Sequence, residues 1–326
     1  MKPEKNKKFK LFDLNRDGKG VEVAEDRTPN LKFFFKLFKR KFNQLLQLNL
    51  LMLFQIIPLL VIFFAVDVYG PKTAMTTDAL YAPLYGISRV APSVSATSML
   101  NLVGIQMESA LYYTPFLMIL TAVMILFLGI TYGWQNVGAA YVLRGLVRGD
   151  AVFVFSDYFY GIKRNRKQAF FMGLFDFVCT VILIIDLLFL NPLTGSGFGT
   201  DVMYFMVLAL IIVYLFMRFY IYQLLITFDL SNFKILKNAL IFTVLGIKRN
   251  LMAFLGILLL VALHALLIFL ALSYGLGAFI VLPLVYIVAM FAFIATYASY
   301  PIIDRYMIAP YAKAESVDTS DETTEE

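Results

Sequence analysis

Long apolar stretches alternate with short polar or basic segments along most of this 326-residue chain. A hydrocarbon core about 30 Å thick is crossed by about 20 consecutive apolar residues in an α-helix. Six stretches reach this length, at residues 44–67, 113–133, 168–190, 202–226, 251–272 and 278–299. The pattern therefore predicts an all-α fold, a polytopic transmembrane helical bundle with six spans.

The composition favours a membrane protein over a soluble globular one. Apolar residues make up 60% of the chain and charged residues only 15%, which is unusual for soluble domains. The polar and basic segment 1–43 precedes the first apolar stretch and is too long for the start of a cleavable signal peptide. We therefore expect the first span to remain in the protein.

The distribution of lysine and arginine predicts the orientation of the spans, because short cytoplasmic loops keep an excess of these residues. When the segments between spans are assigned alternately to the two sides, 26 lysines and arginines fall on one side and 2 on the other. Both termini are therefore predicted to be cytoplasmic.

Three regions follow from these assignments. Residues 1–43 form a basic cytoplasmic segment whose stretch KFFFKLFKRKF (32–42) is expected to form an interfacial helix against anionic headgroups. Residues 44–300 form the transmembrane domain, with an outer loop at 68–112. Residues 301–326 form an acidic tail that is expected to be disordered.

The pentapeptide GIKRN occurs twice, with the two copies 85 positions apart. Both copies face the same side of the membrane because an even number of spans separates them. Each is interpreted as a basic cytoplasmic collar before an outgoing helix. The collar residues are Lys163, Arg164 and Asn165 in the first copy and Lys248, Arg249 and Asn250 in the second. A parallel two-helix repeat and a coincidence both explain the match.

Several stretches resemble the YesL-type family of small bacterial membrane proteins. They include AYVLR at 140–144, SDYF at 156–159, KRNRKQ at 163–168, and the N-terminal stretches FFF at 33–35 and LNLL at 48–51. The motif residues are Tyr141, Arg144, Arg148, Asp157, Lys167 and Gln168. The resemblance implies a multi-pass protein of the bacterial plasma membrane, and some members are linked to carbohydrate uptake or use. Unlike the short members, this chain has the segment 68–112 and a complete second span before Tyr141.

Few ionisable residues lie within the predicted spans, and such residues are costly in lipid. Asp176 and Arg218 each lie eight residues from the cytoplasmic end of adjacent antiparallel spans, or about 12 Å deep. We expect them to form a buried ion pair that holds the two helices together, with a substrate or proton site as the alternative. His264 is expected to hydrogen-bond a neighbouring helix, because a single histidine does not make a metal site.

Motifs for enzymatic chemistry are not recognised in the sequence. It has no HExxH or GxSxG motif and no phosphate-binding glycine loop. Asp13 to Gly18 begin like a calcium loop, but position twelve is Ala24 instead of glutamate. We therefore expect no cofactor, no metal site and no nucleic-acid partner.

The sequence leaves three functional classes open. The preferred interpretation is a non-enzymatic accessory or scaffold protein beside a carbohydrate transporter component, in which the carbohydrate link rests on the resemblance. The alternative is a small permease with a path past Asp176, Arg218 and His264. A membrane-embedded enzyme is the third. A water-filled cavity at Asp176 would favour the permease, and tight packing there would favour the accessory role.

Overall fold

The computed structural model describes residues 28–63, 65, 115–276 and 283–311. These residues form helices and no strands. The helices are α1 (Leu31–Phe63), α4 (Pro115–Arg148), α5 (Val154–Leu190), α6 (Phe198–Thr227), α7 (Asn232–Leu245), α8 (Ile247–Ser273) and α9 (Ile287–Ile303), with a 3₁₀ turn η2 (Asn191–Leu193) and a π-helical turn η4 (Asp304–Ile308). Six helices in the described residues are long and apolar enough to cross a membrane, as the hydropathy pattern predicts.

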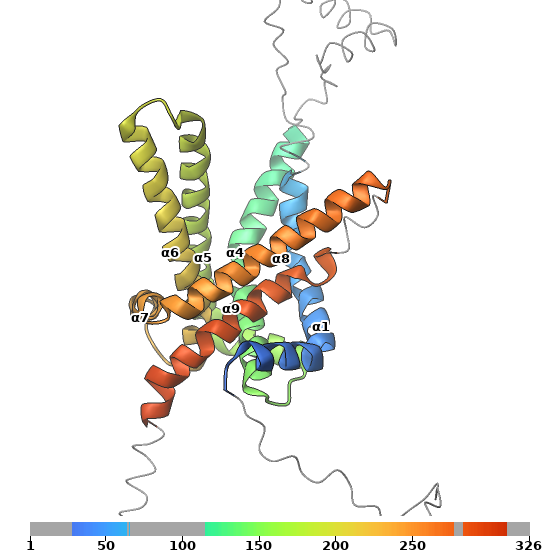
Figure 1. The fold of residues 1–326 in the computed structure, drawn as a ribbon, viewed down its shortest axis with the longest axis vertical. Helices are drawn as coiled ribbons and strands as arrows, with labels where there is room; N and C mark the ends of the chain where they lie inside the picture. The colour runs from blue at the N-terminus through green and yellow to red at the C-terminus, as the bar shows by residue number, and fades with distance from the viewer. Residues whose placement is uncertain (1–27, 64, 66–114, 277–282, 312–326) are drawn as a thin grey trace, which may run out of the picture.

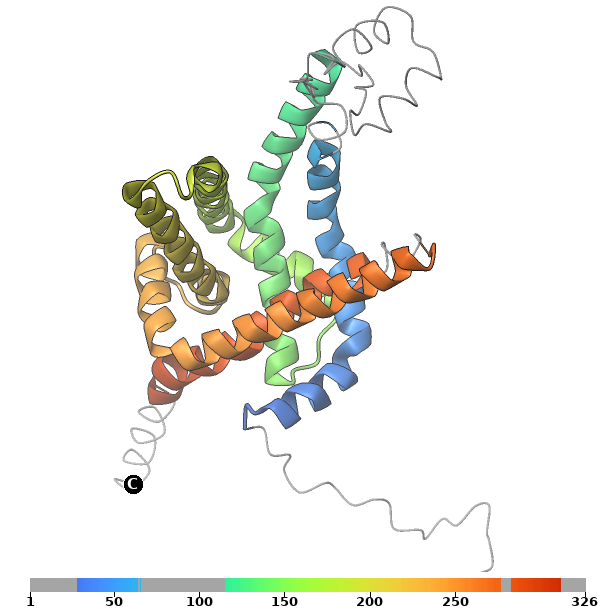
Figure 2. The ribbon, with the colours of Figure 1, turned by 45° about the horizontal axis from the view of Figure 1, so that its top comes forward.

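The packed core lies at one end of the bundle. In α6 the buried side chains all fall between Phe216 and Ile226, and in α5 none lies beyond Asp176. The other halves of α5 and α6 expose apolar side chains such as Phe189 and Phe205. Figures 1 and 2 show the α5–α6 hairpin diverging from α1 and α4 toward the end opposite the core. The core is therefore on the predicted cytoplasmic side, and the exposed apolar surface matches a lipid environment.

Two glycines bring the backbones of α4 and α5 into close contact. A Cβ atom added to Gly133 would lie 1.8 Å from the Ala169 carbonyl oxygen, and one added to Gly173 would lie 2.1 Å from the Gly133 Cα. Small residues allow two helix backbones to touch in this way. These glycines therefore set the spacing of the helix pair that carries much of the site.

Helix α1 packs on α9 through one side of its aromatic N-terminal part. Phe33 and Phe34 are buried, whereas Phe35 is exposed, and the Phe34 ring meets Phe293 with centroids 5.4 Å apart. Figures 1 and 2 show this part of α1 lying across the end of the bundle before the helix turns along α4. The predicted boundary at 43/44 falls inside this helix, so the segment is one element with the first span.

Buried Asn49 fixes the start of α9. Its amide nitrogen donates to the Leu284 carbonyl at 2.6 Å, and its Oδ1 accepts from the Ala289 amide at 2.9 Å. The amides of a first helical turn have no partner within the helix. Asn49 therefore caps α9 from a distant helix, a role that apolar periodicity does not predict.

Several predicted boundaries differ from the structure. Helices α4 and α5 continue well beyond the predicted spans 113–133 and 168–190, because a helix outside lipid needs no apolar composition. The connection between the fourth and fifth spans contains α7, which was not predicted. The predicted disordered tail at 301–326 is wrong for 301–311, where the chain is helical and Ile302 and Ile303 are buried. The outer loop 68–112, the calcium-like stretch and the end of the tail lie outside the described residues.

Candidate functional site

Asp176 of α5 is fully buried, with 0% exposure, and three side chains of α6 hold it. The Tyr222 hydroxyl donates to Asp176 Oδ2 at 2.6 Å, and the Tyr214 hydroxyl donates to Oδ1 at 2.7 Å. Arg218 Nε lies 3.1 Å from Oδ1 and 3.2 Å from Oδ2. The predicted ion pair is confirmed, and both carboxylate oxygens have partners.

The partners of Asp176 share one face of α6, because Tyr214, Arg218 and Tyr222 follow at intervals of four residues. The Arg218 guanidinium also lies over the Tyr132 ring of α4, 5.4 Å from its centroid. Sequence reasoning missed the two tyrosines, although their spacing from Arg218 was a usable signal. The arrangement compensates the buried charge and leaves no carboxylate oxygen without a donor.

His264 of α8 is buried and bonded on both ring nitrogens. Its Nδ1 lies 2.6 Å from the Leu260 carbonyl oxygen, so this nitrogen carries the hydrogen. Its Nε2 accepts from the hydroxyl of Tyr286, the N-cap residue of α9. The predicted hydrogen bond to a neighbouring helix is confirmed. Within the described residues, no hydrogen bond or ion pair connects this pair with Asp176.

Each GIKRN copy lies at a break between two helical segments. In the first copy Asn165 has non-helical angles, φ −113° and ψ 15°, inside α5. In the second copy Gly246 separates α7 from α8. The first copy was expected before its helix and instead lies within it. The break lies at the fifth residue of the first copy and at the first residue of the second, and the two-helix repeat stays a prediction.

The asparagine of each copy caps the helical segment before the break. Asn165 Nδ2 donates to the Gly161 carbonyl, four residues earlier in the same helix, at 3.0 Å. Asn250 Nδ2 donates to the Thr243 carbonyl of α7 at 3.1 Å, and its Oδ1 accepts from the Tyr220 hydroxyl at 2.8 Å. Carbonyls at a helix end need such partners. The pentapeptide thus supplies a capped helix break as well as positive charge.

The glycine of each copy admits a tyrosine from the preceding transmembrane helix. A Cβ at Gly161 would lie 2.7 Å from the Tyr141 Cβ, and one at Gly246 would lie 2.2 Å from the Tyr220 hydroxyl. Any larger residue would displace these rings. The recurrence of glycine in the pentapeptide therefore has a packing reason.

Two arginines bind helix carbonyls on the same side of the bundle. Arg144 Nη1 donates to the Ile226 carbonyl at 3.1 Å and to the Thr227 hydroxyl at 3.0 Å, near the end of α6. Arg249 Nε donates to the Ala298 carbonyl at 3.0 Å, and its Nη2 donates to the Tyr297 carbonyl at 3.2 Å. Positive charge near carbonyl groups at a helix end is stabilising. Both residues hold helices in place.

The other residues of the family-like motif lie on the C-terminal part of α4 and the N-terminal half of α5. Gln168 Nε2 donates to the Leu230 carbonyl at 2.6 Å, and Asp157 Oδ2 accepts from the Phe153 amide at 2.8 Å. Arg148 pairs with Asp150 at 3.4 Å in an exposed position, and the Tyr141 ring lies under the Arg144 guanidinium. These contacts position the connections between helices.

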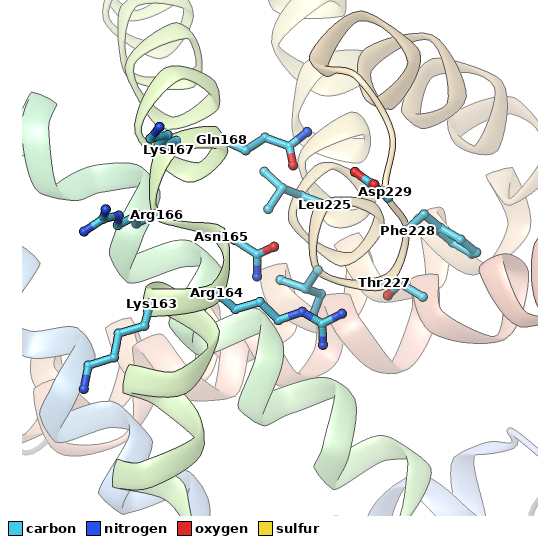
Figure 3. Close-up of a pocket in the computed structure, with 11 residues that line it drawn as sticks. Lys163, Arg164, Asn165, Arg166, Lys167, Gln168, Leu225, Thr227, Phe228 and Asp229 are labelled. Carbon is cyan, nitrogen blue, oxygen red and sulfur yellow. The ribbon is translucent and has the colours of Figure 1, made fainter.

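A cavity of about 490 Å³, here called the kink cavity, lies between the break in α5 and the end of α6. Figure 3 shows the side chains of Arg164, Asn165 and Gln168 extending toward α6. The Asp229 carboxylate faces the same space from the opposite wall. Lys163, Arg166 and Lys167 also line the cavity, but their side chains extend away from it on the other side of α5. Of the charged residues that line the kink cavity, Arg164 and Asp229 therefore direct their side chains toward it from opposing walls.

Metal-ligand clusters of three or more histidine, cysteine, aspartate or glutamate residues are absent from the described part of the chain. Cys179 is half-buried in α5 and has no cysteine partner, since it is the chain's single cysteine.

Comparison with known proteins adds no relative. No family model matches the sequence, and no curated protein and no solved structure matches it either. The resemblance to the YesL-type family stays a prediction.

Proposed function

We propose that this protein is a non-enzymatic accessory or scaffold component of the bacterial plasma membrane, associated with a carbohydrate uptake system. The observation that carries the accessory role is the state of Asp176. Its carboxylate is fully buried and accepts from Tyr214, Tyr222 and Arg218. An ionisable residue inside a membrane is a site for substrates or protons by default, but all the groups here are used to hold α5 against α6.

The position of the kink cavity supports the same role. It opens beside the collar at one end of α5 and α6, and its lining includes neither Asp176 nor His264. The two buried polar groups that a permease path would use are therefore separate from it. This arrangement favours a protein that binds neighbours in the membrane over one that moves a solute.

The exposed half of the α5–α6 hairpin offers a surface for such a neighbour. Its apolar side chains, among them Ile185, Phe189 and Phe205, have no cover within the described chain. Lipid and a partner helix would both satisfy this surface. The carbohydrate part of the proposal comes from the resemblance around Tyr141 and Arg144 alone.

The test combines genetics with reconstitution. A strain lacking the protein should lose uptake of at least one labelled sugar, and the uptake should return when the native gene is restored. The purified protein alone in proteoliposomes should not transport that sugar. In mild detergent it should co-purify with the membrane subunit of the transporter that the uptake defect identifies. Transport by the protein alone would establish the permease, and unchanged uptake of every sugar would remove the carbohydrate link.

A further inference from the structure

We propose that the kink cavity binds the headgroup of a membrane phospholipid that carries both a phosphate and a primary ammonium group, as phosphatidylethanolamine does. Arg164 holds the phosphate, and Asp229 holds the ammonium. This binding site goes beyond the accessory role proposed above and does not depend on it.

The depth of the kink cavity matches a lipid headgroup. Gln168 on one wall is the first residue of the predicted span 168–190, and Ile226 on the other wall is the last residue of the span 202–226. The cavity therefore lies where hydrocarbon gives way to polar headgroups. Its volume of about 490 Å³ is within the usual range for small-molecule sites.

The two charged side chains of the kink cavity are available to a ligand. Arg164 and Asp229 are exposed. Within the described part of the chain, neither side chain forms an ion pair or a hydrogen bond. A guanidinium is suited to a phosphate, and a carboxylate accepts hydrogen bonds from an ammonium.

Other polar groups of the cavity wall already have hydrogen-bond partners within the protein, which leaves the two charged side chains for the ligand. The Ile226 carbonyl is already bonded by Arg144. The Thr227 hydroxyl donates to the Gln223 carbonyl at 2.6 Å. Asn165 and Gln168 each use one amide hydrogen in the hydrogen bonds described above, and an amide has two. The second hydrogen of each is left to support the phosphate.

The carboxylate of Asp229 is the reason to expect a zwitterion in place of a simple anion. A lipid with a phosphate and no cation would face repulsion from Asp229. A choline headgroup has a cation but no N–H donor for the carboxylate. The cations that extend away from the cavity, such as Lys163, attract all anionic lipids alike. Selectivity for a primary ammonium therefore comes from the kink cavity alone.

The experiment measures lipid binding to the delipidated full-length protein in mild detergent by native mass spectrometry. Short-chain lipids with phosphoethanolamine, phosphoglycerol and phosphocholine headgroups serve as probes. The native protein should bind the phosphoethanolamine lipid most tightly. Arg164→Gln should weaken that binding about tenfold, the expected effect of losing one charge-assisted contact. Asp229→Asn should remove the preference over phosphocholine.

Lys163→Gln is the matched control, because it removes a neighbouring collar cation that extends away from the cavity. It should leave the order of the three lipids unchanged. The site assignment fails if Arg164→Gln and Lys163→Gln weaken binding equally, or if Asp229→Asn keeps the native preference. It also fails if phosphoglycerol binds as tightly as phosphoethanolamine. Soluble phosphoethanolamine that competes at the same concentration as the lipid would overturn the lipid source.

Discussion

Arg249 donates a hydrogen bond to the carbonyl of Tyr297, the one carbonyl that Pro301 deprives of its helical partner in α9. A proline inside a helix has no N–H to offer to the carbonyl four residues earlier. Arg249 also donates to the carbonyls of Ala298 and Pro29. A residue predicted only as a collar charge therefore repairs a proline break and ties α8 to α9.

Replacing Arg249 with glutamine should lower the stability of the protein. The loss should be about 1–3 kcal/mol, because the Tyr297 carbonyl would be left without a donor. In a Pro301→Ala background, the restored backbone N–H reaches the Tyr297 carbonyl, so the same replacement should cost less. Denaturation in mixed micelles measures the four proteins of this cycle. Lys248→Gln, an exposed neighbour, serves as control and should melt like the native protein. Equal costs in both backgrounds would show that Arg249 does not act on the proline break.

The Asp176–Arg218 pair should show strong energetic coupling. Asp176→Asn or Arg218→Gln alone leaves a charge without its partner, at a cost of about 3–5 kcal/mol. The double variant removes both charges and should recover most of this loss, with a coupling of at least about 1 kcal/mol. Melting curves in detergent compare the four proteins. Strictly additive losses would contradict the proposed role of the pair in holding the hairpin.

The glycine contact between α4 and α5 predicts different tolerances at two positions one helical turn apart. Gly133→Ala should cost about 3 kcal/mol or more, because the added Cβ collides with backbone atoms and cannot be accommodated by a rotamer change. Gly129→Ala is the matched control, because its Cβ would lie 3.5 Å from the Phe177 ring, an ordinary contact. Thermal unfolding in detergent distinguishes them, and equal melting temperatures would refute the close packing.

The two capping asparagines should differ in importance. Asn250→Ala removes the cap of α7 and also leaves the buried Tyr220 hydroxyl without an acceptor, so we expect a loss of about 2–3 kcal/mol. Asn165→Ala removes one bond to its own helix and should cost about 1 kcal/mol. Chemical denaturation measures both. A larger effect at Asn165 would mean that the break in α5 is the more strained of the two.

The predicted orientation is tested by labelling single cysteines in a Cys179→Ala background. A cysteine in place of Ser196, in the exposed connection between α5 and α6, should react with an impermeant thiol reagent applied outside intact cells. A cysteine in place of Ser156, at the exposed start of α5, should react only after the cells are opened. Labelling at position 156 from outside would reverse the topology.

The sequence by itself determined which parts of the chain form membrane-spanning helices, because burial in lipid imposes length and composition that are visible residue by residue. It also determined that Asp176 and Arg218 meet, since equal depth on adjacent antiparallel helices leaves little freedom. The boundaries of α4, α5 and α9 were missed because the helices extend into segments where no lipid requires apolar residues.

Only the tertiary structure decided what the polar residues at the helix ends do. The cap of Asn49 on α9 joins positions 240 residues apart, and no periodicity encodes that contact. The same holds for the hydrogen bonds of Arg249, because the neighbouring Lys248 carries the same charge but has different surroundings. Charge composition predicts on which side of the membrane a residue lies. The carbonyl or carboxylate that it meets depends on how the helices cross, because a hydrogen bond requires a donor–acceptor distance within a few tenths of an ångström of its optimum.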